Sequence, residues 1–588
     1  MIKKLLEQKK DTLLVIMLIL PIILVGIILV PSAKIPGTTV DEFGYLFNAA
    51  NIVGWDWKEL MQYHPYYGAG AGILWSPLFF LLKNSPTILY QSITIFNFAL
   101  LICTYFISLY CSRKVFPDWN NKIRIISCFI LIFYPCYFFY SQTALSESIL
   151  YFLFWVIILS LVKIEESPNI IWSGLLAVST CYMVIVHMRT AGIALCVAII
   201  AVYLKRKGKL PWKNLILFGI ICCIGIFAWK ALQNQYFIDL GGKNDINTIN
   251  TEISISGMIY SMFWHIPNLI KGIIGRCYYF MVSGNVLFFV SIVFLFKNVF
   301  KKEVLYNSVK KDLSLFLILV FTINLIAFSS QTLEDLSRLD MAVYGRYMDN
   351  IIAPILLFGF YYLTCNTEWI KYISIYIGLI IFMTIVVLYR MEEAISYTFA
   401  IDSAVGFGAF FNYDMSEYSI YLSLLKTICV SIFGAVAFSI VLQITQYKKT
   451  KFFKKFFTLC TLGIILVYWG YLGSASIYKY NFERQALYSA YETIYNIIEE
   501  QNRDKIIYLR NDVDLYGTKA KYLQFLLANQ SIEVDDLSGF DFSDLNEDTI
   551  VIANAGQDFE ELYSMGYEKI WDEQLCIYCI NPENNGGE

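Results

Sequence analysis

The fold is decided by residues 11–51, which read DTLLVIMLILPIILVGIILVPSAKIPGTTVDEFGYLFNAAN. The first half is an apolar run of about 19 residues, the length of one helix across a bilayer. A secretory signal peptide has a shorter apolar core, about 7 to 15 residues, so we interpret this run as an uncleaved anchor and first membrane span. The second half places two adjacent carboxylates, Asp41 and Glu42, shortly after the span.

The composition predicts a polytopic α-helical membrane protein. The 588 residues are 57% hydrophobic and only 16% charged, whereas soluble domains are roughly 25% charged. The formal net charge is -2, and the basic residues are sorted by loop rather than gathered into one stripe, so we predict no nucleic-acid partner.

Apolar runs of spanning length recur along the chain, and we predict about 13 transmembrane helices. Their ranges are near 12–30, 87–110, 123–140, 146–163, 170–186, 190–204, 212–232, 279–296, 312–329, 347–364, 371–389, 418–443 and 456–473.

Loop charge orients these helices, because short cytoplasmic loops are rich in Lys and Arg. The segments MIKKLLEQKK, CSRKVFPDWNNKIR, KRKGK, KNVFKKEVLYNSVKK and QYKKTKFFKK are basic, and each alternates with a sparser segment. We therefore predict a multi-pass protein of the plasma membrane with a cytoplasmic N-terminus. The loop containing Asp41 and everything after about residue 474 then lie outside.

Composition changes again near residue 476, which divides the chain into a transmembrane domain at 1–475 and an extracytoplasmic domain at 476–588. Alternating strand-like and helix-like segments predict that the tail is a small α/β domain. It has no GxGxxG, phosphate loop or nucleophile elbow, so we predict a scaffold or acceptor-docking role. Its CxxC pair, Cys576 and Cys579, lies in a predicted strand and is interpreted as packing rather than metal binding.

Five polar sites reach the predicted outer face, and ionisable groups near membrane depth are functional candidates. In chain order they are Asp41 with Glu42, His64, Glu147, His187 with Arg189, and Arg338 with Arg346.

Each site also has a structural alternative. Adjacent carboxylates can complement a helix dipole, His64 can belong to an interfacial aromatic belt, and Glu147 can belong to a helix cap. Lys426 lies two or three turns inside its span, where it needs a partner or a cavity, or snorkels outward.

Arg189 and Arg346 are the sharper signals, because outer arginines oppose the positive-inside rule. Carboxylates and cations at one boundary fit a reaction in which a nucleophile loses a proton while a phosphate departs. Arginine also matches phosphate geometry.

These motifs resemble the GT-C superfamily of integral membrane glycosyltransferases, in the branch of protein O-mannosyltransferases and bacterial aminoarabinose transferases. The resemblance rests on the Asp-Glu pair after the first span and on HPYY, LSESILYFL, HMRTAGIAL and YGRYMDNIIAP, and covers about residues 10–365. The histidine element departs from the His-Pro-Pro run common in relatives.

The resemblance implies a glycosyltransferase that moves a sugar from a polyprenyl-phosphate donor, with inversion, to a lipid, polymer or protein acceptor on the outer side. Asp41 would be the base, and Glu42 its neighbour or a ligand of an occasional divalent metal ion; no other cofactor is implied. The remaining groups would bind substrate or phosphate: Arg189, Arg346, His187, His64, Glu147, Arg338, Lys426 and Tyr344.

Two other classes stay open. An envelope polysaccharide polymerase or ligase shares outer arginines, but its key groups are expected in late loops such as 233–278 and 330–346. A lipid-linked sugar transporter or flippase is expected to show an internal repeat and broken helices.

Overall fold

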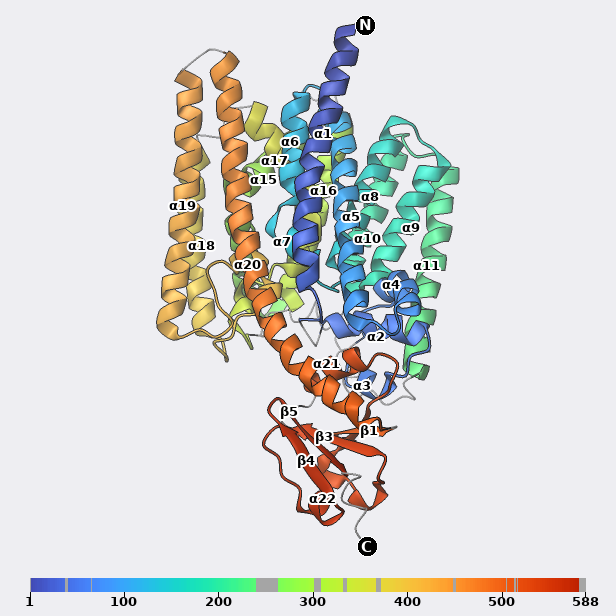
Figure 1. Ribbon diagram of the computed structural model, residues 1–588. Coiled ribbons are helices and arrows are strands. Elements are labelled where there is room, and N and C mark those ends of the chain that lie inside the picture. The colour runs from blue at the N-terminus through green and yellow to red at the C-terminus, as the bar shows by residue number, and fades with distance from the viewer. Residues whose placement is uncertain are drawn as a thin grey trace.

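The computed structural model describes residues 2–580 apart from 38–40, 65, 240–262, 301–307, 332–335, 366–371, 448–450, 504, 512–513 and 515–516. It shows a helical bundle with the N-terminus at one end and a small sheet domain at the other (Figure 1). We refer to these as the N-terminal end and the sheet end.

The bundle is built from long apolar helices and a few short ones at the sheet end. The bounds are α1 (Ile2–Leu29), α2 (Glu42–Ile52), α3 (Lys58–Met61), α4 (Gly70–Leu81), α5 (Pro86–Val115), α6 (Asn121–Ile132), α7 (Pro135–Tyr140), α8 (Glu147–Glu166), α9 (Ile170–Val186), α10 (Ala191–Arg206), α11 (Trp212–Asp239), α14 (Ile266–Ser283), α15 (Asn285–Phe300), α16 (Ser308–Gln331), α17 (Arg346–Cys365), α18 (Ile373–Glu392), α19 (Glu417–Tyr447) and α20 (Lys451–Gln501).

Ten helices in the described part of the chain are long and apolar enough to cross a membrane, or eleven if α14 and α15 form one bent span. The predicted polytopic helical membrane protein is thus confirmed. The predicted thirteen also counted α9, which has 17 residues, and the α6–α7 pair.

Two predicted spans are not continuous helices. The range 123–140 breaks between α6 and α7, where Pro135 has no N–H for a continuing helix and instead occupies the first turn of α7. The range 279–296 breaks at Gly284, where α14 and α15 meet at 116° and Asn285 adopts a φ of 49°.

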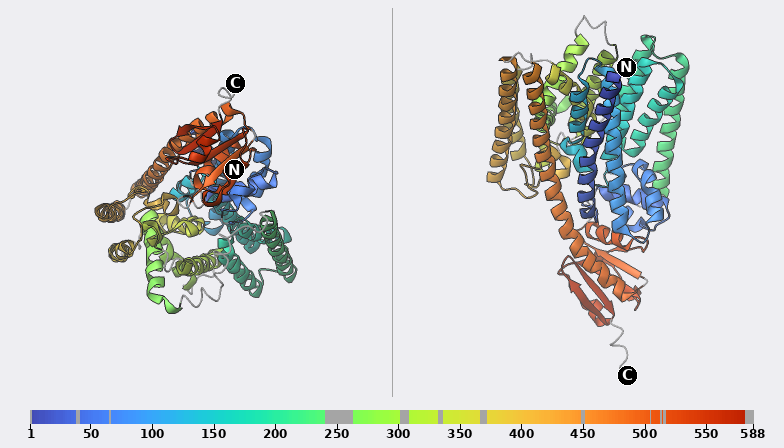
Figure 2. Two further views of the ribbon diagram at one scale, coloured as in Figure 1. Left: turned by 90° about the horizontal axis from the view of Figure 1, so that it is seen from below. Right: turned by 45° about the horizontal axis from the view of Figure 1, so that its top comes forward.

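Burial separates the centre of the bundle from its flanks. In α17 89% of the most apolar window is buried, against 11% in α1 and 6% in α11. Figure 2 shows the bundle from below and tilted, with α18 and α19 on the flank opposite α9 and α11. The first residue of α17, Arg346, is itself only 3% exposed, so the centre of the bundle holds a buried charged group.

The helix α20 leaves the bundle and continues unbroken through residues 475 and 476 into the sheet domain. That domain contains α21 (Thr518–Leu527), α22 (Glu560–Ser564) and the strands β1 (Lys505–Arg510), β2 (Glu533–Asp536), β3 (Thr549–Asn554), β4 (Tyr567–Asp572) and β5 (Leu575–Ile580). The strand order is β2-β1-β3-β5-β4; β1 runs parallel to β2 and β3, and β5 antiparallel to β3 and β4. The predicted α/β tail is confirmed.

The sheet domain packs against the loop that follows α2. Trp57 donates from Nε1 to the carbonyl of Ala528 at 2.6 Å, and the buried Lys521 donates from Nζ to the carbonyl of Tyr63 at 3.3 Å. Arg510 lies over the Tyr63 ring, 4.1 Å from its centroid. These contacts fix the loop that carries His64 and Tyr67.

Candidate active site

Asp41 lies at the sheet end, immediately before α2. Its Oδ1 accepts a hydrogen bond from the Tyr67 hydroxyl at 2.9 Å, and its Oδ2 pairs with Nη1 of Arg346. The side chain keeps 25% of its exposure. Burial disfavours the charged form, but Arg346 and Tyr67 outweigh it and lower the pKa of Asp41, so the carboxylate is ionised and reachable.

Arg346 begins α17 and is 3% exposed. Its guanidinium contacts three carboxylates: Asp41, Glu147 through Nε at 2.5 Å, and Asp402 through Nη1 at 3.2 Å. Glu147 begins α8 and is fully buried, where the positive end of the helix dipole favours its charge. Arg346 thereby holds together the starts of α2 and α8 and the segment between α18 and α19.

Arg189 extends the same network from the short turn between α9 and α10. Its Nη2 donates to Oε1 of Glu147 at 2.7 Å, and its guanidinium lies 5.0 Å from the centre of the Tyr347 ring. Its Nε is buried and has no hydrogen-bond partner among the residues that the structure describes. This N–H is a donor available to an incoming ligand.

His187 closes a ring of contacts around the site. Its Nδ1 accepts from the backbone N–H of Arg189 at 3.3 Å, and its imidazole stacks on Tyr67, with the centroids 5.6 Å apart. Burial and the nearby Arg189 hold the pKa of His187 well below its usual value, so the ring is neutral near pH 7. Since Tyr67 donates to Asp41, His187 and Tyr67 connect the acid and Arg189 within one network of contacts.

His64 supports this ring from behind. It is fully buried and packs edge-on against Tyr67, centroids 5.6 Å apart, and against Phe47 at 5.5 Å. A Cβ at Gly44 would approach His64 to 2.5 Å and Tyr67 to 2.7 Å. Glycine at position 44 therefore allows the close packing that orients Tyr67.

Glu42 points into a different set of partners from Asp41. It is fully buried; its Oε1 accepts from the Tyr90 hydroxyl at 2.6 Å and the Ala144 N–H at 2.7 Å. Its Oε2 accepts from the Gly37 N–H at 2.5 Å and the Tyr480 hydroxyl at 3.2 Å. Glu42 thus joins the loop before α2 to α5, to the segment before α8 and to α20.

The three remaining predicted site residues, like Glu42 and the two histidines, lie outside the ion-pair network. Arg338 forms a paired contact with Asp340, both distances 3.1 Å. Lys426 is exposed on α19. Tyr344 packs its ring against Tyr347, centroids 4.7 Å apart, and so lines the cluster through an aromatic contact.

The sequence reasoning missed Asp402 and did not assign a role to Tyr67. Asp402 belongs to the segment between α18 and α19; burial and the nearby Asp41 outweigh Arg346 and raise its pKa to about 6. The available signal was a single carboxylate among small and apolar residues, in AIDSAVGFGAFF. That pattern resembles an ordinary loop.

A bound metal ion stays a prediction. Among the described residues, no group of three or more His, Cys, Asp or Glu side chains could hold one. Asp41 and Glu42 also direct their oxygens to separate partners.

Comparison with known proteins finds relatives in structure only. No protein-family profile matches the sequence, and no curated protein matches it. ArnT from Cupriavidus metallidurans bound to undecaprenyl phosphate superposes with a TM-score of 0.54 at 10% identity, covering 97% of this chain and 99% of that one. The apo form of ArnT superposes with a TM-score of 0.48 at 12% identity, covering 95% and 97% of the two chains.

The first of these superpositions shows a shared fold over nearly the whole of both chains. The shared fold extends beyond residues 10–365, the range over which the sequence resembles the family, and includes the sheet domain. The predicted GT-C-like fold is confirmed.

Proposed function

We propose that this protein is a membrane glycosyltransferase that moves a sugar from a polyprenyl-phosphate donor to an acceptor at the sheet end of the bundle. The proposal is carried by one observation: Asp41, ionised and partly exposed, shares a network with two buried arginines that lie 148 and 305 residues further along the sequence. The fold shared with ArnT, whose structure contains undecaprenyl phosphate, supports the donor class.

Asp41 is the proposed general base. It would accept the proton of the acceptor hydroxyl as that oxygen attacks the anomeric carbon of the sugar. Tyr67 and Arg346 orient the carboxylate, and general-base catalysis of this kind contributes typically 10²–10⁴-fold. One displacement, with base and leaving group on opposite faces of the sugar, inverts the configuration.

The arginines are the proposed partners of the departing phosphate. The unpartnered Nε of Arg189 offers the first contact. The three carboxylates on Arg346 occupy its Nε and Nη1, so a phosphate that reached Nη1 would have to replace one of them. Asp402 is the best candidate for replacement, because its 3.2 Å contact is longer than that of Glu147 and its raised pKa allows it to become neutral.

The two other classes fit the geometry less well. The key groups of a polymerase or ligase are expected in the late loops, yet Arg338 there pairs with its own neighbour Asp340. A transporter is expected to use broken helices, and α14 and α15 do meet at a break. Asn285 at that break, however, hydrogen-bonds Tyr376 rather than a member of the Asp41 network.

The test uses lipids from the producing cells, because the sugar is unidentified. Purified full-length protein is mixed with lipid-linked sugars extracted from cells that lack it, together with their envelope fraction. We expect release of free polyprenyl phosphate and, in the cells without the protein, accumulation of one donor lipid; both are measured by mass spectrometry. Unchanged lipid-linked sugars in both experiments would overturn the proposal.

A further inference from the structure

A second feature with ligand-binding character lies at the N-terminal end, on the seam between α1, α6 and α20. The pocket there has a volume of about 370 Å³. It is lined by Lys10, Leu13, Leu14, Met17, Lys122, Ile123, Ile126 and Leu459. Six of these eight side chains are apolar, and the two that are not are both lysines.

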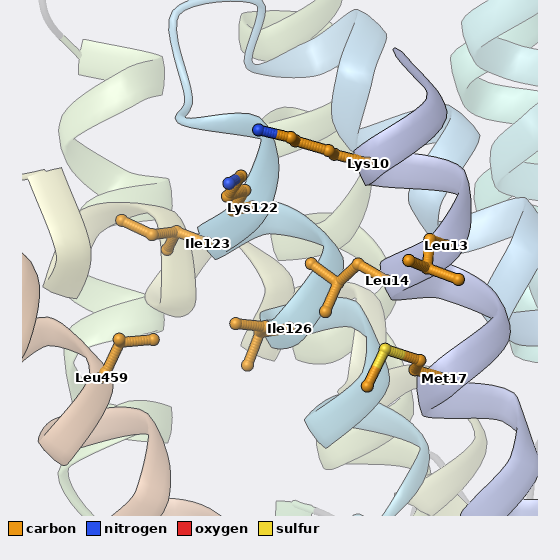
Figure 3. Close-up of a pocket in the computed structure, with 8 residues that line it drawn as sticks. All are labelled: Lys10, Leu13, Leu14, Met17, Lys122, Ile123, Ile126 and Leu459. Atoms are coloured by element: carbon orange, nitrogen blue, oxygen red, sulfur yellow. The ribbon is translucent and has the colours of Figure 1, made fainter. Parts of the chain in front are cut away.

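The two lysines come from different helices. Figure 3 shows Lys10 extending from α1 toward α6, where Lys122 sits at the same end of the pocket, with Leu14, Met17 and Ile126 further along. Both lysines are exposed. Within the described residues neither ammonium group has a hydrogen bond or an ion pair, so positive charge caps one end of an apolar cleft.

Two charged neighbours of this pair, Asp11 and Arg124, are engaged with other groups. Asp11 accepts a hydrogen bond from Asn121, which ties α1 to α6 beside the pocket. Arg124 turns inward and donates to the carbonyls of Phe116 at 2.7 Å and Trp119 at 2.9 Å. Lys10 and Lys122 are the two charged residues in the lining of the cleft, and an occupant would meet them first.

We propose that this cleft binds an anionic phospholipid, with the phosphate between Lys10 and Lys122 and an acyl chain along Leu14, Met17, Ile126 and Leu459. A phosphodiester above a hydrocarbon chain matches the order of charge and apolar surface along the seam. With the predicted cytoplasmic N-terminus, the site faces the leaflet in which anionic lipids are concentrated.

The position of the pocket across the membrane distinguishes this lipid from the proposed sugar donor. Lys10 lies roughly 28 Å from Leu29 along α1, at about 1.5 Å per residue, and Asp41 lies beyond Leu29. A phosphate at Lys10 is therefore at the opposite membrane surface from Asp41 and Arg346. The occupant is a lipid bound by the scaffold rather than a substrate in position to react.

The experiment measures lipid binding to the full-length protein by native mass spectrometry. Wild type is titrated with phosphatidylglycerol and with phosphatidylcholine of the same acyl chains. We expect at least about tenfold tighter binding of phosphatidylglycerol, and loss of that preference in the double variant K10Q/K122Q. The control R206Q/K213Q removes two exposed charges of the same end, away from the cleft, and should keep the preference.

A second variant tests whether the acyl chain of the lipid occupies the cleft. Ile126→Trp fills the cleft while both lysines remain, and should weaken phosphatidylglycerol binding although the charges are unchanged. The proposal is overturned if wild type binds both lipids equally, if K10Q/K122Q keeps the preference, if Ile126→Trp binds as wild type does, or if polyprenyl phosphate displaces phosphatidylglycerol in a lysine-dependent way. None of these outcomes depends on glycosyltransferase activity.

Discussion

Asp41 and Glu42 are neighbours in the chain but belong to two different regions of the molecule. Asp41 joins an ionic network of two arginines and two further carboxylates, and remains 25% exposed. Glu42 is fully enclosed and accepts hydrogen bonds from neutral donors on the loop before α2, on α5 and on α20. The comparison teaches that adjacent carboxylates can take different roles: Asp41 is the proposed base, whereas Glu42 holds together the elements that position it.

The largest loss of turnover is expected for Asp41→Asn. The amide keeps the shape of the side chain but cannot accept a proton, so we expect turnover to fall by about 10²–10⁴-fold. The melting temperature should change little, because Arg346 retains its contacts with Glu147 and Asp402. Release of polyprenyl phosphate and thermal unfolding are measured on the same preparation.

The matched control is Asp56→Asn, an exposed aspartate in the same loop, which should leave both quantities unchanged. Near-normal turnover in Asp41→Asn would remove the proposed base and with it the distinction from Glu42.

Arg346→Gln tests whether the ionic region also stabilises the fold. Removing one partner of a buried ion pair costs about 3–5 kcal/mol, because the remaining charges lose their compensation. We expect a large drop in thermal stability. In the protein that remains folded, donor binding should be weakened more than acceptor binding, relative to wild type. Equal losses for donor and acceptor would contradict a phosphate-holding role.

Lys505→Gln is the control for this change, since Lys505 pairs with Glu533 and both side chains are exposed, at 40% and 48%. An exposed pair is worth about 1 kcal/mol or less.

Glu42→Ala addresses the other region. It leaves the hydroxyls of Tyr90 and Tyr480 and the N–H groups of Gly37 and Ala144 without this acceptor, and buried donors left unpaired cost about 1–3 kcal/mol. We expect a clear loss of thermal stability, with turnover per folded molecule reduced much less than in Asp41→Asn.

Glu59→Ala removes an exposed glutamate from the same loop region and should leave thermal stability unchanged. If Glu42→Ala instead abolishes turnover while the melting temperature is kept, Glu42 belongs to the chemistry and the proposed division is wrong.

The sequence predicted the membrane fold and most members of the network for separable reasons. Long apolar runs identify spans regardless of neighbours, and outer arginines such as Arg189 and Arg346 oppose a general charge rule, so both signals are local. The broken ranges 123–140 and 279–296 were predicted as continuous because hydropathy does not report helix direction. Pro135 and Gly284 were the only local signs of a break, and both residues are common in membrane helices.

The finer geometry of the network could not be read from the sequence. The pairing of Glu147 with both arginines depends on how α8, α17 and the α9–α10 turn meet in space. The same holds for Asp402, which reaches Arg346 from a loop between α18 and α19. The strand β2 has no alternating apolar pattern to identify it in the sequence, because only one of its four residues is buried.

The smallest expected effect is on the pH dependence of thermal stability, through the protonation of Asp402 in the ionic network. Its pKa of about 6 lies above the usual value for aspartate, so between about pH 4 and 6 the folded protein holds a proton that the unfolded chain has lost. Stability from this group therefore falls as pH rises through that window. Asp402→Asn stays neutral throughout and should lack this fall. Its melting temperature relative to wild type should therefore rise by about 1–2 °C from pH 4 to 6 and no further above pH 6.

Asp414→Asn changes an exposed aspartate of the same segment and should show no such rise. A parallel pH profile for Asp402→Asn and wild type would mean that Asp402 is ionised throughout, and that Arg346 keeps all three carboxylates when the donor arrives.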